Sequence, residues 1–252
     1  MKKGAVMTNA KGVVRHIPNV ITLLNLVSGC LAIVSAFEGN LYLAGWLIVI
    51  AAVFDFFDGF TARLLGAYSP LGKELDSLSD VVSFGVAPSI ILFHLLKAAL
   101  GISGSEGFTT GHFLLAVPFI MAAFSSLRLG IFNLDERQTS SFIGLPTPAN
   151  AMLIVGLVFG LNSSWGGLFQ TITSSPVVLI ALTLVMSGLL VCNLPMFSLK
   201  LKSLSVKSAY KQLILLCGIV VLVVAFGMAS LSFVILLYIL LSLLFWMIEP
   251  AR

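Results

Sequence analysis

The sequence predicts an all-α integral membrane protein with about eight transmembrane helices. Hydrophobic residues make up 59% of the 252-residue chain and charged residues only 10%, against about 25% charged residues in a typical soluble domain. So few charges cannot cover a water-exposed surface. The apolar residues also gather in runs of roughly 20, the length that a helix needs to cross a bilayer.

Eight apolar stretches of this kind follow one another along the chain. They are Ile17–Phe37, Leu41–Leu65, Leu78–Leu100, Phe113–Leu134, Leu145–Leu161, Pro176–Leu194, Leu213–Met228 and Leu231–Ile248. No small-residue cleavage site follows a short apolar core near the N-terminus, so we expect the first stretch to be a retained helix. The last two are separated only by Ala229 and Ser230, and together they are too long for one crossing.

The basic residues orient the predicted bundle. If the helices alternate in direction, most Lys and Arg residues fall on one side of the membrane: Lys2, Lys3, Lys11, Arg15, Arg63, Lys73, Arg137, Lys200, Lys202, Lys207, Lys211 and Arg252. The opposite loops contain Glu38 and Glu106. By the positive-inside rule, both termini are expected in the cytoplasm, in a cytoplasmic membrane of prokaryotic type. This placement accounts for the net charge of +4, so we expect the lipid bilayer, and no nucleic acid, as a partner.

These observations divide the chain into four expected parts. Residues 1–16 form a cytoplasmic N-terminal segment, and residues 17–194 form a six-helix transmembrane core. Residues 195–212 form a basic cytoplasmic loop, and residues 213–252 contain a C-terminal transmembrane hairpin. The candidate catalytic and ligand-binding residues all lie in the six-helix core.

Aspartates are concentrated in one segment of the core. The chain has only ten acidic residues, and four of them are the aspartates between positions 55 and 80. Asp55 and Asp58 are three residues apart. Asp76 and Asp80 are four apart, so each pair lies on one face of a helix. A short turn around Tyr68–Pro70 makes the two helices antiparallel neighbours, whose carboxylates can meet near the cytosolic boundary.

Four carboxylates at close range repel one another, and partial burial strengthens the repulsion. Either some of them take up protons or cations bind, and two divalent cations would balance the four charges. Ligands that are all oxygen favour Mg²⁺, Mn²⁺ or Ca²⁺ over Zn²⁺. Paired metals about 3.5–4 Å apart can hold the attacking and leaving oxygens of a displacement at phosphorus. The sequence therefore predicts a site for two divalent cations, Mg²⁺ or Mn²⁺.

Small and basic residues accompany the aspartates. Gly59 and Ala62 share the face of the first aspartate pair, and Gly72 lies one turn before the second. Without bulky side chains there, a large ligand can approach the backbone. Arg63 and Lys73 place positive charge beside the carboxylates, which suits phosphate oxygens.

The aspartate segment resembles the signature of the CDP-alcohol phosphatidyltransferase family. All eight signature positions are present, in the pattern Asp55-x2-Asp58-Gly59-x2-Ala62-Arg63-x8-Gly72-x3-Asp76-x3-Asp80. The resemblance implies a transmembrane bundle like that of the family, a two-metal site, and displacement of CMP from a CDP-linked lipid by an alcohol. It also implies a homodimer.

The resemblance further implies roles for individual residues. Asp55, Asp58 and Asp76 would hold the first metal. Asp80 would be a ligand of the second metal and the general base that takes a proton from the attacking hydroxyl. The residues implied to bind CDP-diacylglycerol are Gly59, Ala62, Arg63, Ser69 and Gly72, together with Asn19 and Thr22 of the first helix.

Other segments are similar to those of family members that use serine as the acceptor alcohol. These segments are Ile17–Leu26, Glu74–Pro88, Leu127–Leu129, Phe132–Asn133 and Phe142–Pro148. They imply transfer of the phosphatidyl group from CDP-diacylglycerol to L-serine. Arg128 lies within a predicted helix, where a charge is costly, and we expect Arg128 and Lys73 to hold the serine carboxylate. The alternative for Arg128 is snorkelling to the cytosolic interface.

Two other functions stay open. Another acceptor, such as glycerol 3-phosphate or an inositol phosphate, would bring a phosphate and should need more basic residues around the pocket. A divalent-cation transporter would need polar residues along a path across the membrane. The outer halves of the second and third predicted helices, such as Ile48–Val53 and Ile90–Leu96, are nearly all apolar, which disfavours transport.

Overall fold

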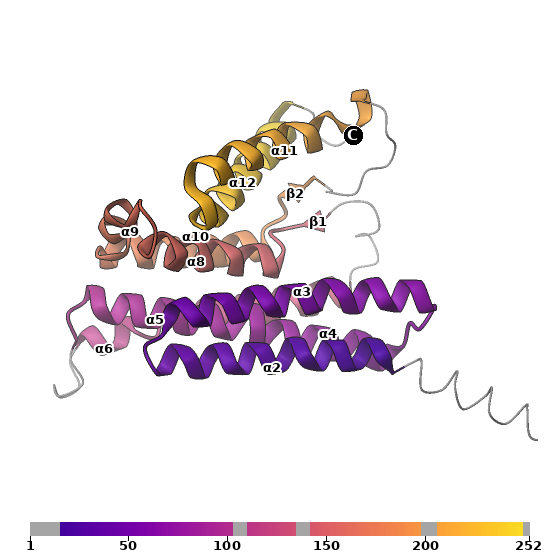
Figure 1. Ribbon diagram of the computed structural model, residues 1–252, viewed down its shortest axis with the longest axis horizontal. Helices are drawn as coiled ribbons and strands as arrows, with labels where there is room; N and C mark the ends of the chain where they lie inside the picture. Colours follow the sequence, from indigo (N-terminus) through magenta and orange to yellow (C-terminus); the bar gives the residue numbers. More distant parts are fainter. Residues whose placement is uncertain (1–15, 103–109, 135–141, 198–205, 249–252) are drawn as a thin grey trace, which may run out of the picture.

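The computed structural model describes residues 16–102, 110–134, 142–197 and 206–248, and most of them are helical (Figure 1). The all-α prediction is confirmed. One short antiparallel pair, β1 (Phe142–Ile143) with β2 (Pro195–Met196), adds to it. Segments of two residues are too short to produce an alternating pattern, so the sequence did not predict them.

The first two helices form an antiparallel hairpin. Helix α2 (Ile17–Phe37) carries Pro18 in its first turn, where the missing amide hydrogen costs nothing. Helix α3 (Leu41–Leu65) is capped by Asn40, whose side-chain oxygen accepts a hydrogen bond from the amide of Leu43 at 3.0 Å. It ends at Gly66, which has a φ of 57°, a conformation that glycine adopts readily.

The next helical segment runs through three elements, α4 (Pro70–Asp80), the π-helical turn η1 (Val81–Val86) and α5 (Ala87–Ala99). Its apolar part begins only at Leu78, but the helix begins at Pro70 because Ser69 caps it. The Ser69 Oγ accepts a hydrogen bond from the amide of Gly72 at 2.9 Å, as expected of an N-cap. The π-turn follows directly after Asp80, and such turns often mark functional positions.

The middle of the chain is more broken than predicted. The apolar stretch that ends at Leu134 is divided into α6 (Thr110–Leu114) and α7 (Pro118–Leu134), because Pro118 cannot continue a preceding helix. Helix α8 (Thr147–Leu161) follows. The short helix α9 (Gly166–Thr173) was not predicted, and it meets α10 (Pro176–Val191) at an angle of 83°.

The last part of the described chain is a helical hairpin. Helix α11 (Val206–Phe226) and helix α12 (Ser230–Ile248) are joined by the 3₁₀ turn η2 (Gly227–Ala229). Figure 1 shows α11 and α12 at one side of the molecule, α8 beneath them, and α2 and α3 on the opposite side. Helix α8 contacts both α3 and α12, so it is the central helix of the bundle.

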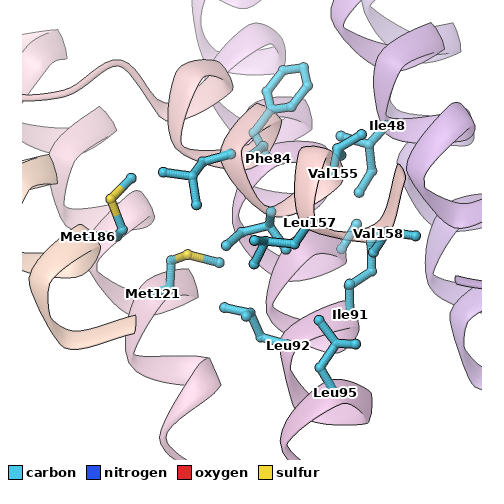
Figure 2. Packing of buried hydrophobic residues seen from close by; sticks show 14 of the residues in the cluster. Ile48, Phe84, Ile91, Leu92, Leu95, Met121, Val155, Leu157, Val158 and Met186 are labelled. Carbon is cyan, nitrogen blue, oxygen red and sulfur yellow. The ribbon is translucent and has the colours of Figure 1, made fainter. Parts of the chain in front are cut away.

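The buried core surrounds α8. Ile48, Phe84, Ile91, Val155 and Leu157 bring side chains from α3, η1, α5 and α8 into one cluster (Figure 2). This cluster holds the aspartate-bearing helices α3 and α4 in place through their apolar continuations. The site is therefore positioned by packing deeper in the bundle.

Helix length and composition indicate a multi-pass membrane protein. Four described segments are long and apolar enough to cross a bilayer: Ile17–Phe37, Leu41–Leu65, Pro70–Ala99 and Tyr210–Ile248. The bent pair of α9 and α10 brings the count to five, and α7 and α8 are apolar but shorter. Within Tyr210–Ile248, Gly218 of α11 faces Leu237 of α12, so this segment folds back on itself. Length alone does not establish the eight predicted crossings.

A close approach between α2 and η1 makes Gly29 a sensitive position. A methyl group at Gly29 would lie 2.8 Å from the Cα of Ser83. Overpacking of this kind costs roughly 1–3 kcal/mol, so we expect Gly29→Ala to lower the thermal unfolding temperature in detergent and to reduce activity. Gly188→Ala is the matched control, since an added methyl there meets nothing within 4 Å. Equal stability of the two variants would contradict the close approach.

Candidate active site

A cavity of about 510 Å³ opens where α2, α3 and α4 meet at the α3–α4 turn. Its lining consists of Pro18, Asn19, Thr22, Asp58, Gly59, Ala62, Ala67, Tyr68, Ser69, Pro70, Gly72, Lys73 and Asp76. This volume lies in the range of sites that bind small molecules and cofactors. Three elements from the first 80 residues therefore form one pocket.

The predicted aspartates meet beside this cavity. Asp55, Asp76 and Asp80 each place a carboxylate oxygen within 4.8 Å of the others. Asp58 is not in that group, although it lines the cavity together with Asp76. Asp58 and Asp80 are buried, with 6% and 7% of their surfaces exposed. The antiparallel arrangement of α3 and α4 thus brings Asp55 of the first pair close to both members of the second pair.

The donor set fits divalent cations. Carboxylates this close repel one another, and burial strengthens the repulsion. The Oδ2 atom of Asp58 is also buried without a hydrogen-bond partner, so one oxygen of this carboxylate has no protein donor. Oxygen ligands of this kind suit Mg²⁺, Mn²⁺ or Ca²⁺. The four aspartates could therefore hold metal ions.

Asn25 of α2 holds Asp80, a contact that the sequence did not predict. Asn25 is completely buried, and its Nδ2 donates a hydrogen bond to Oδ1 of Asp80 at 3.3 Å. Two hydroxyls also link α2 to α4 and η1: Ser79 donates to the carbonyl of Thr22 at 3.2 Å, and Ser83 donates to the carbonyl of Asn25 at 3.0 Å. The available signal was the polar stripe of Thr22 and Asn25, three residues apart in an apolar helix.

Most residues predicted to bind the lipid nucleotide line the cavity. A methyl group at Gly72 would lie 3.0 Å from Oδ1 of Asn19 and 3.1 Å from Oγ of Ser69, so a side chain there would crowd α2. A methyl group at Gly59 would meet only Arg63 within 4 Å. The exception to the prediction is Arg63 itself. It is exposed, is not among the lining residues, and donates to the carbonyl of Gly59 at 3.0 Å.

The two predicted serine ligands have different surroundings. Lys73 lines the cavity, and its Nζ donates to the carbonyl of Asn133 at 2.9 Å, which ties α4 to the end of α7. Arg128 is only 7% exposed, and its Nη1 donates to Oγ1 of Thr147 at 3.4 Å. A snorkelling arginine would reach water. Arg128 instead lies close enough to Asp80 for an electrostatic attraction.

The sequence profile of the CDP-alcohol phosphatidyltransferase family matches residues 15–246. The chain belongs to this family. Because the match includes α2, α3 and α4, the cavity and the cluster of aspartate carboxylates lie in the family domain. The chain is thus an enzyme of the phosphatidyltransferase class, and the prediction of that class is confirmed.

Three curated relatives of this phosphatidyltransferase are 35–37% identical to it over 140–152 residues. The CDP-diacylglycerol–serine O-phosphatidyltransferase of Bacillus subtilis is 37% identical over 58% of this chain and 77% of its own length. That of Helicobacter pylori strain J99 is 36% identical over 55% of each chain. The archaetidylserine synthase of Methanothermobacter thermautotrophicus is 35% identical over 59% of this chain and 60% of its own. The match therefore spans little more than half of the last two relatives.

Proposed function

We propose that this enzyme transfers the phosphatidyl group from CDP-diacylglycerol to the hydroxyl of L-serine and releases CMP and phosphatidylserine. The observation that carries the proposal is the cluster of three carboxylates, those of Asp55, Asp76 and Asp80, beside a cavity of about 510 Å³. The names of the relatives support serine as the acceptor. Two name CDP-diacylglycerol and serine, and the third names archaetidylserine, so the alcohol is shared although the lipid differs.

In this proposal, the residues of the cavity bind the cytidine diphosphate part of the donor, and the acyl chains stay in the bilayer. The residues proposed for this role are Asn19, Thr22, Gly59, Ala62, Ser69 and Gly72 of the cavity lining, together with Arg63, which lies outside the lining and contacts Gly59. Two divalent cations, Mg²⁺ or Mn²⁺, held by Asp55, Asp58, Asp76 and Asp80, would neutralise the diphosphate and the charge that develops on CMP.

Asp80 is the proposed general base. Asn25 donates to its Oδ1, which leaves Oδ2 to take the proton from the serine hydroxyl. The serine oxygen then bonds to the phosphorus that carries diacylglycerol, and the bond from that phosphorus to the oxygen of CMP breaks. A displacement at phosphorus depends on positioning and charge neutralisation more than on a protein nucleophile.

The proposal also includes the orientation and assembly of the chain. With eight crossings that alternate in direction, the catalytic core of residues 17–194 would open its cavity to the cytoplasm, and both termini would lie there. The predicted basic loop of residues 195–212 would follow, although its last residues belong to α11, which begins at Val206, and then the predicted hairpin of residues 213–252. The distribution of Lys and Arg supports this orientation. The family resemblance supports a homodimer, which cross-linking in membranes would test.

Product identification tests the acceptor. Purified enzyme is incubated with CDP-diacylglycerol, Mn²⁺ or Mg²⁺, and radiolabelled L-serine, glycerol 3-phosphate or an inositol phosphate in separate reactions. We expect a labelled lipid and equimolar CMP with serine alone. A labelled lipid from glycerol 3-phosphate or an inositol phosphate, with none from serine, would overturn serine as the acceptor and leave the reaction class intact.

Arg128 is the residue proposed to hold the serine carboxylate. Lysine lacks the planar fork of the guanidinium, so an Arg128→Lys variant cannot form paired hydrogen bonds with a carboxylate. We expect the KM for serine to rise by about tenfold, which corresponds to ~1.4 kcal/mol, while the KM for CDP-diacylglycerol stays unchanged. Steady-state kinetics with each substrate varied in turn measure both values. An unchanged KM for serine would remove Arg128 from the acceptor site.

A further inference from the structure

Asn150, in the first turn of α8, is a buried amide without partners. It is completely buried, and neither its Oδ1 nor its Nδ2 has a hydrogen-bond partner. Folded proteins pair the great majority of buried side-chain polar atoms, so an amide with both ends unpaired needs an explanation. An apolar residue of similar size would fill the same space without leaving these atoms unpaired.

The position of Asn150 relates it to Arg128. Thr147 lies one turn before Asn150 on α8, and its Oγ1 accepts the hydrogen bond from Arg128 of α7. Residues three apart share a side of a helix, so Asn150 lies one turn deeper in the bundle than the contact between Arg128 and Thr147. Met121 of α7 and Leu157 of α8 lie still deeper, in the core cluster of Figure 2.

A second unpaired group lies on α7, one turn before Arg128. Ser125 is three residues before Arg128 and is completely buried, and its Oγ has no partner. A methyl group at Gly85 would lie 3.1 Å from the Cβ of Ser125. Gly85 belongs to η1, the turn that directly follows Asp80. The polar groups of α7 and α8 therefore lie next to the helical segment that carries the proposed base.

Arg128 has unused hydrogen-bonding capacity as well. Its Nε is buried and unpartnered, although its Nη1 is paired with Thr147. A buried guanidinium needs an anion and several acceptors. The unpaired Nε supplies a donor, and the unpaired amide of Asn150 supplies two donor hydrogens and one acceptor.

We propose that Asn150 and Arg128 form the subsite that binds the α-carboxylate and α-ammonium of the acceptor. This inference rests on the proposed transfer to serine. Arg128 binds the α-carboxylate. The Nδ2 of Asn150 donates to the same carboxylate, and the Oδ1 of Asn150 accepts from the α-ammonium. Ser125, one turn before Arg128 and next to Gly85, bounds the subsite on the side of η1.

The chemistry of the pair favours a zwitterion over a phosphate-bearing alcohol. A phosphate dianion has only acceptor oxygens, so it would satisfy Arg128 and leave the Oδ1 of Asn150 unpaired. An amino alcohol without a carboxylate would satisfy Oδ1 and leave Arg128 without an anion. An α-amino acid satisfies both, and its ammonium also complements the negative charge of Asp80, which lies within electrostatic range of Arg128.

The experiment compares Asn150→Leu with the wild-type enzyme on three acceptors: L-serine, 3-hydroxypropionate, which lacks the ammonium, and ethanolamine, which lacks the carboxylate. We expect the KM for serine to rise by about tenfold or more. The wild-type preference for serine over 3-hydroxypropionate should shrink in the variant by a similar factor. The KM for CDP-diacylglycerol and the thermal stability should be unchanged, or the stability should be higher.

Two further variants complete the test. Asn150→Ala introduces no bulk and carries the same expectation if Asn150→Leu does not fold. Asn162→Ala, at the other end of α8, removes an amide whose Nδ2 donates to the carbonyl of Val158, and should leave the KM for serine unchanged. An active Asn150 variant with the wild-type KM for serine and the wild-type preference would overturn the inference. A wild-type enzyme that transfers to another alcohol and not to serine would instead overturn the proposed function.

Discussion

Asp80→Asn should lower kcat by about 10²–10⁴-fold and leave the binding of CDP-diacylglycerol nearly intact. The asparagine amide has almost the same shape as the carboxylate, and its oxygen can still accept the hydrogen bond from Asn25. It cannot take a proton from an attacking hydroxyl. Asp80 is also not among the lining residues of the nucleotide cavity, so its replacement should spare the surface that the donor contacts.

The measurement combines two readouts on the same preparation. CMP release under saturating substrates gives kcat, and a direct binding titration gives the affinity for CDP-diacylglycerol. Glu74→Gln is the matched control, because Glu74 is an exposed acid on the same helix and should keep full activity. A near-normal rate of Asp80→Asn would show that another group, or water, accepts the proton.

The aspartates could be predicted from the sequence because their information is local. Spacings of three and four residues report the face of a single helix, and the turn at Ser69 makes α3 and α4 neighbours. Asn25 could not be predicted in the same way. It lies 55 positions from Asp80, and only the packing of α2 against α4 and η1 reveals that they touch. The same holds for Asn150, whose significance depends on being buried without a partner.

The fold shows the same difference between local and tertiary information. Long apolar runs predicted α2, α3, α10 and α12 within a few residues. The polar residues before Leu213 hid the first turns of α11, which begins at Val206. The π-turn η1 left no signal, because an apolar stretch in a buried helix has no face to reveal a change of period. The angle between α9 and α10 depends on how α9 packs, with Phe169 of α9 lying against Gly160 of α8. Hydropathy describes an environment and does not specify such contacts.

Asp76→Asn should have the widest effect of the single aspartate substitutions. Among the described residues, Asp76 alone belongs both to the group of three mutually close carboxylates and to the lining of the cavity. Its replacement removes one negative charge from the carboxylates proposed to hold the metals. It also alters the surface proposed to contact the diphosphate. We expect kcat/KM to fall by about 10³-fold or more, with weaker binding of both Mn²⁺ and CDP-diacylglycerol.

The contrast between Asp76→Asn and Asp80→Asn separates binding from proton transfer. Titration with Mn²⁺ in the absence of lipid measures the affinity of the site for metal, independently of turnover. We expect Asp76→Asn to need at least about tenfold more Mn²⁺ for half-saturation, as for a lost group around a metal, and high Mn²⁺ should recover part of its activity. High Mn²⁺ should offset any loss of metal binding through Asp80 but should not restore the turnover of Asp80→Asn, because added metal does not supply a base. Wild-type affinity of Asp76→Asn for Mn²⁺ and for CDP-diacylglycerol would mean that the close carboxylates serve another purpose, and that the reaction is organised elsewhere in the bundle.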